Sequence, residues 1–218
     1  YAGKTAEETI DYGEKALASG GLDDLSKCQI LIAVSDLYSR RGQNLEKAKN
    51  YASQAVEIAK ANKSRGAEEA NPAAWDKILG YAYFAQGQAY DKAKEAKNAV
   101  TPYIESYKIL KDPQILANLK KVGKTLYEFK FYKDAEKAFE VIAQSLKDFD
   151  SYRLYAGVLH RNGKKREALE YYKMAYMKQK SGDVAYNIGI IEAEDAKSNP
   201  LIAQEAIRYL LDATFLSA

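Results

Sequence analysis

The chain has 218 residues, of which 47% are hydrophobic and 29% are charged, and its formal net charge is +3 at pH 7. No run approaches the roughly 20 consecutive apolar residues of a membrane-spanning helix, so we expect no transmembrane segment in this chain. The small net charge excludes a surface that is basic overall, and the single cysteine, Cys28, excludes an internal disulfide.

Residues 5–18 are expected to form one amphipathic helix, because Ile10 and Leu17 fall on the same face. Gly20 and Gly21 follow directly and predict the end of that helix. Its small residues match those of the second helix of a helix pair. We therefore expect an orphan helix, that is, a second helix without the first helix of its pair.

The first complete helix pair is predicted over residues 23–62. Asp23 or Asp24 supplies a cap for its first helix. The apolar residues of that helix fall on one face, which we call the apolar stripe, and Ser35 is the small residue within this stripe. Gly42 is expected to end that helix, and the second helix follows from about Leu45 to Asn62.

A polar stretch at residues 63–72 predicts a loop, and a second helix pair is expected over residues 73–111. Gly80 reads as the small residue of its first helix, which is expected to end near Gly87. Ala93 is then the corresponding alanine of the second helix, thirteen residues after Gly80.

Two central pairs, predicted over residues 115–147 and 149–180, repeat almost in register. Gly123 and Ala156 are the small residues of their first helices and lie 33 residues apart. Ala135 follows Gly123 by twelve residues, and Ala168 follows Ala156 by the same distance. A fixed period of this size predicts a solenoid of stacked helix pairs rather than one globular core.

The last pair, predicted over residues 183–216, is the least regular. Gly189 is the small residue of the apolar stripe in its first helix, but Glu192 occupies a stripe position at which leucine or tyrosine is expected. Phe215 and Leu216 follow without a polar capping helix, which a solenoid end needs for solubility. We therefore expect either a longer natural chain or an end that packs against another molecule.

The pattern resembles the tetratricopeptide repeat (TPR), a unit of two antiparallel helices of roughly 34 residues with a small residue in the first helix and alanines in the second. The resemblance rests on Gly123, Ala156, Ala135, Ala168 and Ala175. It implies an all-α fold, a right-handed superhelix of stacked antiparallel helix pairs, forming a single domain over residues 1–218. It also implies a noncatalytic scaffold or adaptor.

No catalytic constellation is present in the sequence. There is no glycine-rich phosphate loop, no paired-cysteine spacing and no helical pattern of histidine with carboxylates. His160 and Cys28 are the only histidine and cysteine and lie far apart in the sequence. We therefore expect that the protein is not an enzyme and has no catalytic residues, metal or cofactor.

The resemblance also implies a concave groove lined by the face of the first helices beside the core stripe. That face is basic and aromatic in the middle of the chain, where lysine and arginine would attract an acidic segment or a carboxylate terminus. The alternative is that lysine is simply the commonest exposed residue. The predicted peptide-binding residues are Lys77, Tyr81, Phe84, Lys120, Lys124, Tyr127, Arg153 and His160.

Some TPR proteins bind the tails of heat-shock chaperones through a clamp that needs asparagines between its basic residues. Lys124 and Leu154 stand where those asparagines would be, so we do not expect chaperone-tail binding.

The sequence thus predicts a noncatalytic protein-interaction scaffold that binds a peptide or helical segment of a partner in its concave groove. One alternative is a structural protein that forms homo-oligomers through its uncapped ends. In a third, weaker reading the groove holds RNA or another anionic polymer. The sequence names neither partner nor compartment; we expect a soluble protein, cytoplasmic, or periplasmic if a leader preceded Tyr1.

Overall fold

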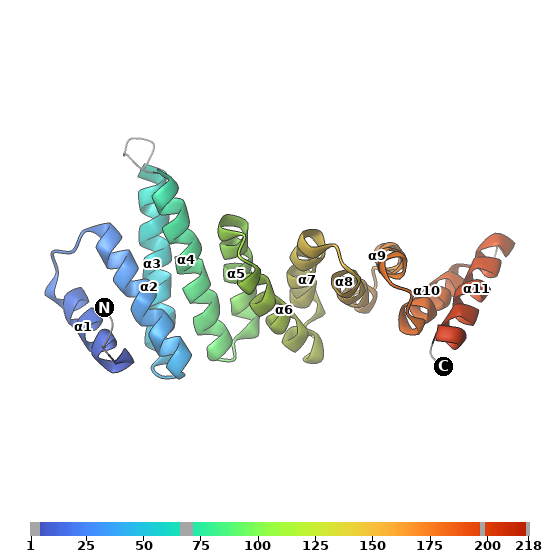
Figure 1. Cartoon of the computed structure of the whole chain (residues 1–218), viewed down its shortest axis with the longest axis horizontal. Helices are drawn as coiled ribbons and strands as arrows, with labels where there is room; N and C mark the ends of the chain where they lie inside the picture. The colour runs from blue at the N-terminus through green and yellow to red at the C-terminus, as the bar shows by residue number, and fades with distance from the viewer. Residues whose placement is uncertain (1–4, 66–71, 197–198, 217–218) are drawn as a thin grey trace. The chain divides into compact units, whose positions relative to one another are not determined.

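A computed structural model describes residues 5–65, 72–196 and 199–216, and every regular element in these ranges is a helix (Figure 1). The predicted all-α fold of antiparallel helix pairs is confirmed. The greater part of the predicted loop at 63–72 lies outside the described residues, since these resume at residue 72. Within the described ranges, no helix has both the length and the hydrophobicity needed to cross a membrane.

Contacts along the backbone group the chain into two compact units, Tyr1–Val122 and Gly123–Ala218. The helices of the first unit are α1 (Ala6–Ser19), α2 (Asp24–Arg41), α3 (Leu45–Arg65), α4 (Pro72–Lys92), α5 (Ala96–Leu110) and the greater part of α6 (Pro113–Glu128). The second unit contains the end of α6 and α7 (Tyr132–Leu146), α8 (Phe149–Arg161), α9 (Lys165–Lys178), α10 (Gly182–Asp195) and α11 (Pro200–Leu216).

In the first unit, each helix from α1 to α4 packs on the next one along the chain, and α2 also packs on α4. The predicted helix boundaries at Gly20 and Gly42 are confirmed, and Asp23 is the residue that caps α2. The core between α2, α3 and α4 is built from small and aliphatic side chains around one tryptophan: Cys28, Leu31, Ala55, Val56, Ala59, Trp75, Leu79 and Ala82.

The first helix is attached to the pair that follows it. One carboxylate oxygen of Glu14 on α1 accepts hydrogen bonds from the Tyr38 hydroxyl at 2.8 Å, the Lys47 ammonium at 2.8 Å and the Tyr51 hydroxyl at 3.1 Å. These three donors come from α2 and α3, so a single acidic side chain links α1 to both helices of the first pair.

The helix boundary expected near Gly87 is wrong, because α4 continues through Gly87 to Lys92. A Cβ atom at Gly87 would lie 2.7 Å from the ring of Tyr103, so α5 packs directly onto the α4 backbone at this point. Gly123 makes the equivalent contact with Phe139, and in both cases the aromatic residue follows the glycine by sixteen. Gly87, rather than Gly80, is thus the structural counterpart of Gly123.

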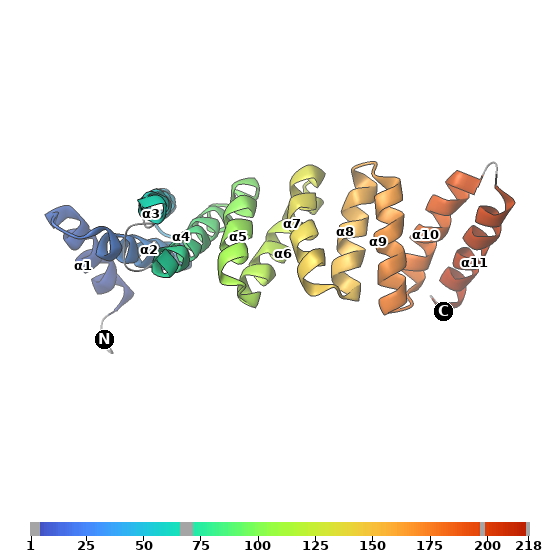
Figure 2. The ribbon, with the colours of Figure 1, turned by 90° about the horizontal axis from the view of Figure 1, so that it is seen from above.

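In the second unit, α7 packs on α8, α8 on α9, α9 on α10, and α10 on α11 (Figure 2). Its core contains Phe139, Ile142, Leu159 and Ile188, each at most 1% exposed. Asp148 begins α8 with a reciprocal capping box to Ser151. Helix α9 therefore packs on both of the first helices α8 and α10.

Candidate functional site

The second unit contains a pocket of about 230 Å³ on the face of its first helices. The end of α6, α8 and the start of α10 provide most of its wall, and α7 and α9 each provide one aromatic side chain. The lining residues are Lys124, Tyr127, Glu128, Phe139, Arg153, Leu154, Gly157, Tyr172, Asp183, Val184 and Asn187.

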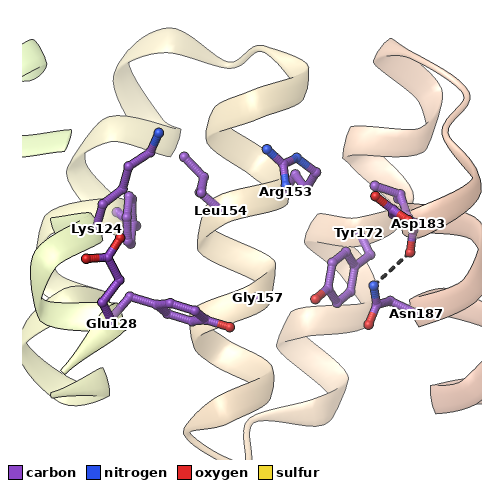
Figure 3. Close-up of a pocket in the computed structure, with 11 residues that line it drawn as sticks. Lys124, Glu128, Arg153, Leu154, Gly157, Tyr172, Asp183 and Asn187 are labelled. Atoms are coloured by element: carbon purple, nitrogen blue, oxygen red, sulfur yellow. Dashed lines mark hydrogen bonds between the residues drawn. The ribbon is translucent and has the colours of Figure 1, made fainter. Parts of the chain in front are cut away.

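Gly157 and Tyr172 are the two residues that give the pocket its depth. A Cβ atom at Gly157 would meet only the Tyr172 hydroxyl, at 3.7 Å, so the missing side chain leaves open space inside the pocket. Tyr172 is 5% exposed, and its hydroxyl makes no hydrogen bond to any residue that the structure describes. Figure 3 shows its ring beside Gly157.

Burial raises the pKa of Tyr172 to about 12, so its hydroxyl is protonated at neutral pH. This hydroxyl faces the pocket and can donate a hydrogen bond to an acceptor atom of a ligand. The pocket therefore combines room for a side chain with one unused donor.

Charged groups of both signs surround the opening. Lys124 makes no ion pair with any described residue, whereas Arg153 pairs with Asp150 at 3.2 Å. On the α10 side, the Asn187 amide donates to the backbone carbonyl of Asp183 at 2.7 Å. In Figure 3, Lys124 and Glu128 lie on one side of Gly157, and Asp183 and Asn187 lie on the other.

The first unit has a separate pocket of about 460 Å³ between α2 and α4. Its wall is mainly apolar, and Arg40 at one end is paired with Asp36 at 2.9 Å. The buried side-chain oxygen of Gln88 has no hydrogen-bond partner among the described residues. The lining residues are Gln29, Ile32, Ala33, Asp36, Arg40, Ile78, Tyr81, Phe84, Ala85 and Gln88.

The predicted groove residues divide between these two pockets and their surroundings. Tyr81 and Phe84 line the pocket of the first unit, and Lys124, Tyr127 and Arg153 line that of the second. The remaining predicted residues, Lys77, Lys120 and His160, line neither pocket.

His160 is half-buried near the end of α8. Burial lowers its pKa, and the nearby Lys165 lowers it further, which favours the neutral imidazole.

Several lining residues were not predicted from the sequence. Tyr172 belongs to the second helix of its pair, α9, where periodicity predicts a core residue. Asp183 and Asn187 belong to the irregular last pair, where the register of the stripe was least clear.

Among the residues with described positions, no group of three histidine, cysteine or carboxylate side chains could hold a metal ion. The one cysteine, Cys28, is buried, and burial raises its thiol pKa to about 11. The chemistry available at both pockets is therefore hydrogen bonding, charge pairing and apolar contact.

No protein-family model matches this chain, and no curated protein matches it. Among solved structures, it is similar to YrrB, a TPR protein with an unusual peptide-binding site, at 17% identity and a TM-score of 0.48, covering 94% of this chain and 97% of that one. It is also similar to MamA from Desulfovibrio magneticus RS-1, at 17% identity and a TM-score of 0.44, covering 88% and 95%.

A third similar structure is the TPR2AB domain of yeast Sti1 in complex with pHSP90, at 17% identity and a TM-score of 0.39, covering 96% of this chain and 92% of that one. The chain itself has an all-α fold of successive helix pairs, with close contacts from Gly87 to Tyr103 and from Gly123 to Phe139.

Proposed function

We propose that this protein is a noncatalytic interaction module that binds an extended segment of a partner protein across the first-helix face of its second unit. The observation that carries the proposal is the pocket beside Gly157, where open space meets the hydroxyl of the largely buried Tyr172, which makes no hydrogen bond to a described residue. A helix surface without a pocket, on which every polar group has a hydrogen-bond partner, would have neither the open space nor the available hydroxyl.

The pocket defines the kind of side chain that the segment inserts. Tyr127, Phe139 and Leu154 supply apolar wall, so the stem of the inserted side chain is apolar. The Tyr172 hydroxyl lies at the inner end and donates a hydrogen bond, so the tip of that side chain carries an acceptor oxygen. A glutamine or glutamate side chain has this combination of stem and tip.

The charges at the opening limit the rest of the segment. Lys124 is exposed and attracts one carboxylate, but Glu128 and Asp183 also border the pocket and would repel a uniformly acidic chain. The side-chain oxygen of Asn187 can accept a hydrogen bond from a peptide N–H. The structure therefore favours a segment with one acidic residue near Lys124 over a polyacidic tail.

The test is a selection of random peptides displayed on phage against the immobilised full chain, with a Gly157→Leu variant used for counter-selection. A Cβ atom at this position meets no backbone atom within 4 Å, and the larger leucine side chain is chosen to fill the open space. We expect enriched peptides that bind the original chain and lose at least about tenfold in affinity for Gly157→Leu. Failure to enrich any peptide, or equal binding to both proteins, would contradict the proposal.

A second candidate function is self-association through α11. Large apolar side chains on this helix are exposed, with Leu201 at 75%, Leu211 at 53% and Phe215 at 79%, and they fall on one side of the helix. Exposed apolar groups of this size on one helix face are typical of an interface.

Sedimentation over a range of protein concentrations distinguishes the two candidates. Self-association through α11 predicts a dimer or larger species that returns to monomer in a Leu211→Glu, Phe215→Glu variant. A groove binder whose α11 face is not an interface stays monomeric at all concentrations.

A further inference from the structure

The turn between α6 and α7 carries two exposed aromatic side chains. Phe129 is 68% exposed and Phe131 is 42% exposed, with Lys130 between them. Aromatic rings at the tip of a turn cannot contribute to the buried core in proportion to their size. Phe129 in particular has most of its surface exposed, so burial of its ring contributes little to the stability of the fold.

The matching turn between α8 and α9 shows that the fold does not require these rings. Lys130 has φ 62° and Gly163, 33 residues later, has φ 78°, so the two turns share the same left-handed backbone position. The residues on either side of Gly163 are Asn162 and Lys164, and both donate to Glu136 at 2.6 Å. The corresponding positions thus hold polar, paired side chains in one turn and phenylalanines in the other.

The two turns belong to one edge of the second unit. Arg161, at the end of α8, donates to the hydroxyl of Tyr127 near the end of α6 at 3.4 Å. Lys130, Lys133 and Arg166 are exposed on this edge and form no ion pair with any described residue. Three cations without an ion-pair partner among the described residues therefore lie near the two phenylalanines, together with the exposed carboxylate of Glu128 beside Phe129.

We propose that this edge, formed by Phe129, Lys130, Phe131, Lys133 and Arg166, binds the surface of an anionic lipid bilayer. Phenylalanine rings gain free energy by entering the boundary between headgroups and acyl chains, and lysine and arginine side chains reach the headgroup phosphates and carboxylates. The two kinds of side chain alternate along the turn, so the rings enter the interface while the cations remain at headgroup level.

The projecting turn favours a bilayer over other anionic partners. A fluid lipid surface accepts a protruding ring without needing a complementary shape. A single-stranded nucleic acid instead needs a groove along which bases stack in succession on aromatic faces. The rings lie on one turn tip, two residues apart, and do not form such a row.

The experiment is sedimentation of the full chain with two kinds of vesicle, pure phosphatidylcholine and phosphatidylcholine containing about one third phosphatidylserine. We expect binding to the anionic vesicles alone, weakened by added salt. Replacing both rings, Phe129→Asn with Phe131→Asn, keeps the charge and should reduce partitioning at least about tenfold. Neutralising Lys130→Gln with Lys133→Gln should reduce it by a similar factor.

A matched control lies on the turn between α7 and α8. Leu146 is 44% exposed and Lys147 has φ 54°, so Leu146→Asn with Lys147→Gln changes an apolar residue about as exposed as Phe131 and a lysine in the same left-handed backbone region as Lys130. This variant should bind anionic vesicles as the original chain does. Circular dichroism verifies that all variants keep their helices.

Three results would overturn the proposal. The first is no binding of the original chain to anionic vesicles, and the second is equal binding by the ring variant. The third is retention of single-stranded RNA on a filter by a chain that does not bind vesicles, which would assign this edge to nucleic acid.

Discussion

The ammonium group of Lys173 on α9 lies 2.6 Å from a carboxylate oxygen of Glu192 on α10, and Glu192 is 3% exposed. The same ammonium lies 3.2 Å from Glu205 on α11, so one lysine joins three successive helices. Burial lowers the pKa of Lys173, but the hydrogen bonds to both carboxylates outweigh it and the pKa lies above its ordinary value. This ion pair explains why an acidic residue is tolerated where the stripe predicts leucine or tyrosine.

Removing the lysine should cost more than removing the glutamate. In Lys173→Met the Glu192 carboxylate remains buried without a counter-charge, which we expect to destabilise the fold by about 3 kcal/mol. In Glu192→Leu the ammonium keeps Glu205 and access to water, so the expected loss is below about 1.5 kcal/mol. Urea unfolding of the two variants and of the double variant measures the coupling. Equal losses in the two single variants would contradict this assignment.

Two glycine-to-alanine substitutions should shift stability in opposite directions. Gly157→Ala adds a methyl group in ordinary contact distance of Tyr172 and should stabilise α8 by up to about 1 kcal/mol through helix propensity. Gly87→Ala places its methyl 2.7 Å from the buried Tyr103 ring and should destabilise by about 1–3 kcal/mol. Thermal unfolding measures both, and a lower melting temperature for Gly157→Ala would show that the pocket beside it is not open.

Attachment of α1 should depend on pH through Glu14. The hydrogen bond from Lys47, joined by those from Tyr38 and Tyr51, holds the Glu14 pKa below its ordinary value of 4.5. A lowered pKa means that the stabilisation is fully present above pH 4.5 and is lost as pH falls below it through the lowered value.

Hydrogen exchange of the α1 amides, corrected for intrinsic rates, should therefore show protection falling over that acidic range. Glu14→Gln should be less protected at neutral pH and should lack this part of the pH dependence. Protection that is unchanged from neutral to acidic pH in the original chain would exclude the Glu14 cluster as the attachment.

Lys124 should contribute to peptide capture through charge. For a peptide selected on the original chain, Lys124→Glu should weaken binding about tenfold at low salt and should make the remaining affinity less sensitive to salt. Lys77→Glu is the matched control, because Lys77 is an exposed lysine on a first helix that lines neither pocket. Fluorescence anisotropy of a labelled peptide gives both affinities; equal losses would point to a general charge effect.

The helix pairs could be predicted from the sequence because their ends are encoded locally. Gly42 and Gly163 have φ 64° and 78°, a left-handed conformation that glycine adopts without steric cost, and each ends a first helix or its turn. The register of the second pair could not be predicted, because Gly80 and Gly87 lie seven residues apart, almost two full turns, on the same face. Only the contact with Tyr103 shows which glycine takes the close-packing position.

The choice of Gly80 instead of Gly87 as the close-packing glycine has a limited effect on the predicted binding residues. A shift of two turns keeps the same helix face, so Tyr81 and Phe84 still line a pocket, and the unpredicted Gln88 lies one turn further along it. Tyr172 could not be predicted as a lining residue from helix periodicity. Its ring packs as the stripe predicts, and its hydroxyl reaches the pocket only because Gly157 on the neighbouring helix has no side chain.

The central claim is that a partner segment binds in the pocket beside Gly157, and photo-crosslinking tests it most directly. A selected peptide carrying a photoreactive side chain at its inserted position is irradiated with the full chain, and the attached residues are identified by mass spectrometry. The account predicts crosslinks to Tyr127, Leu154, Tyr172 or Val184, and their loss in Gly157→Leu. Crosslinks concentrated on the exposed face of α11, or unchanged in Gly157→Leu, would contradict it.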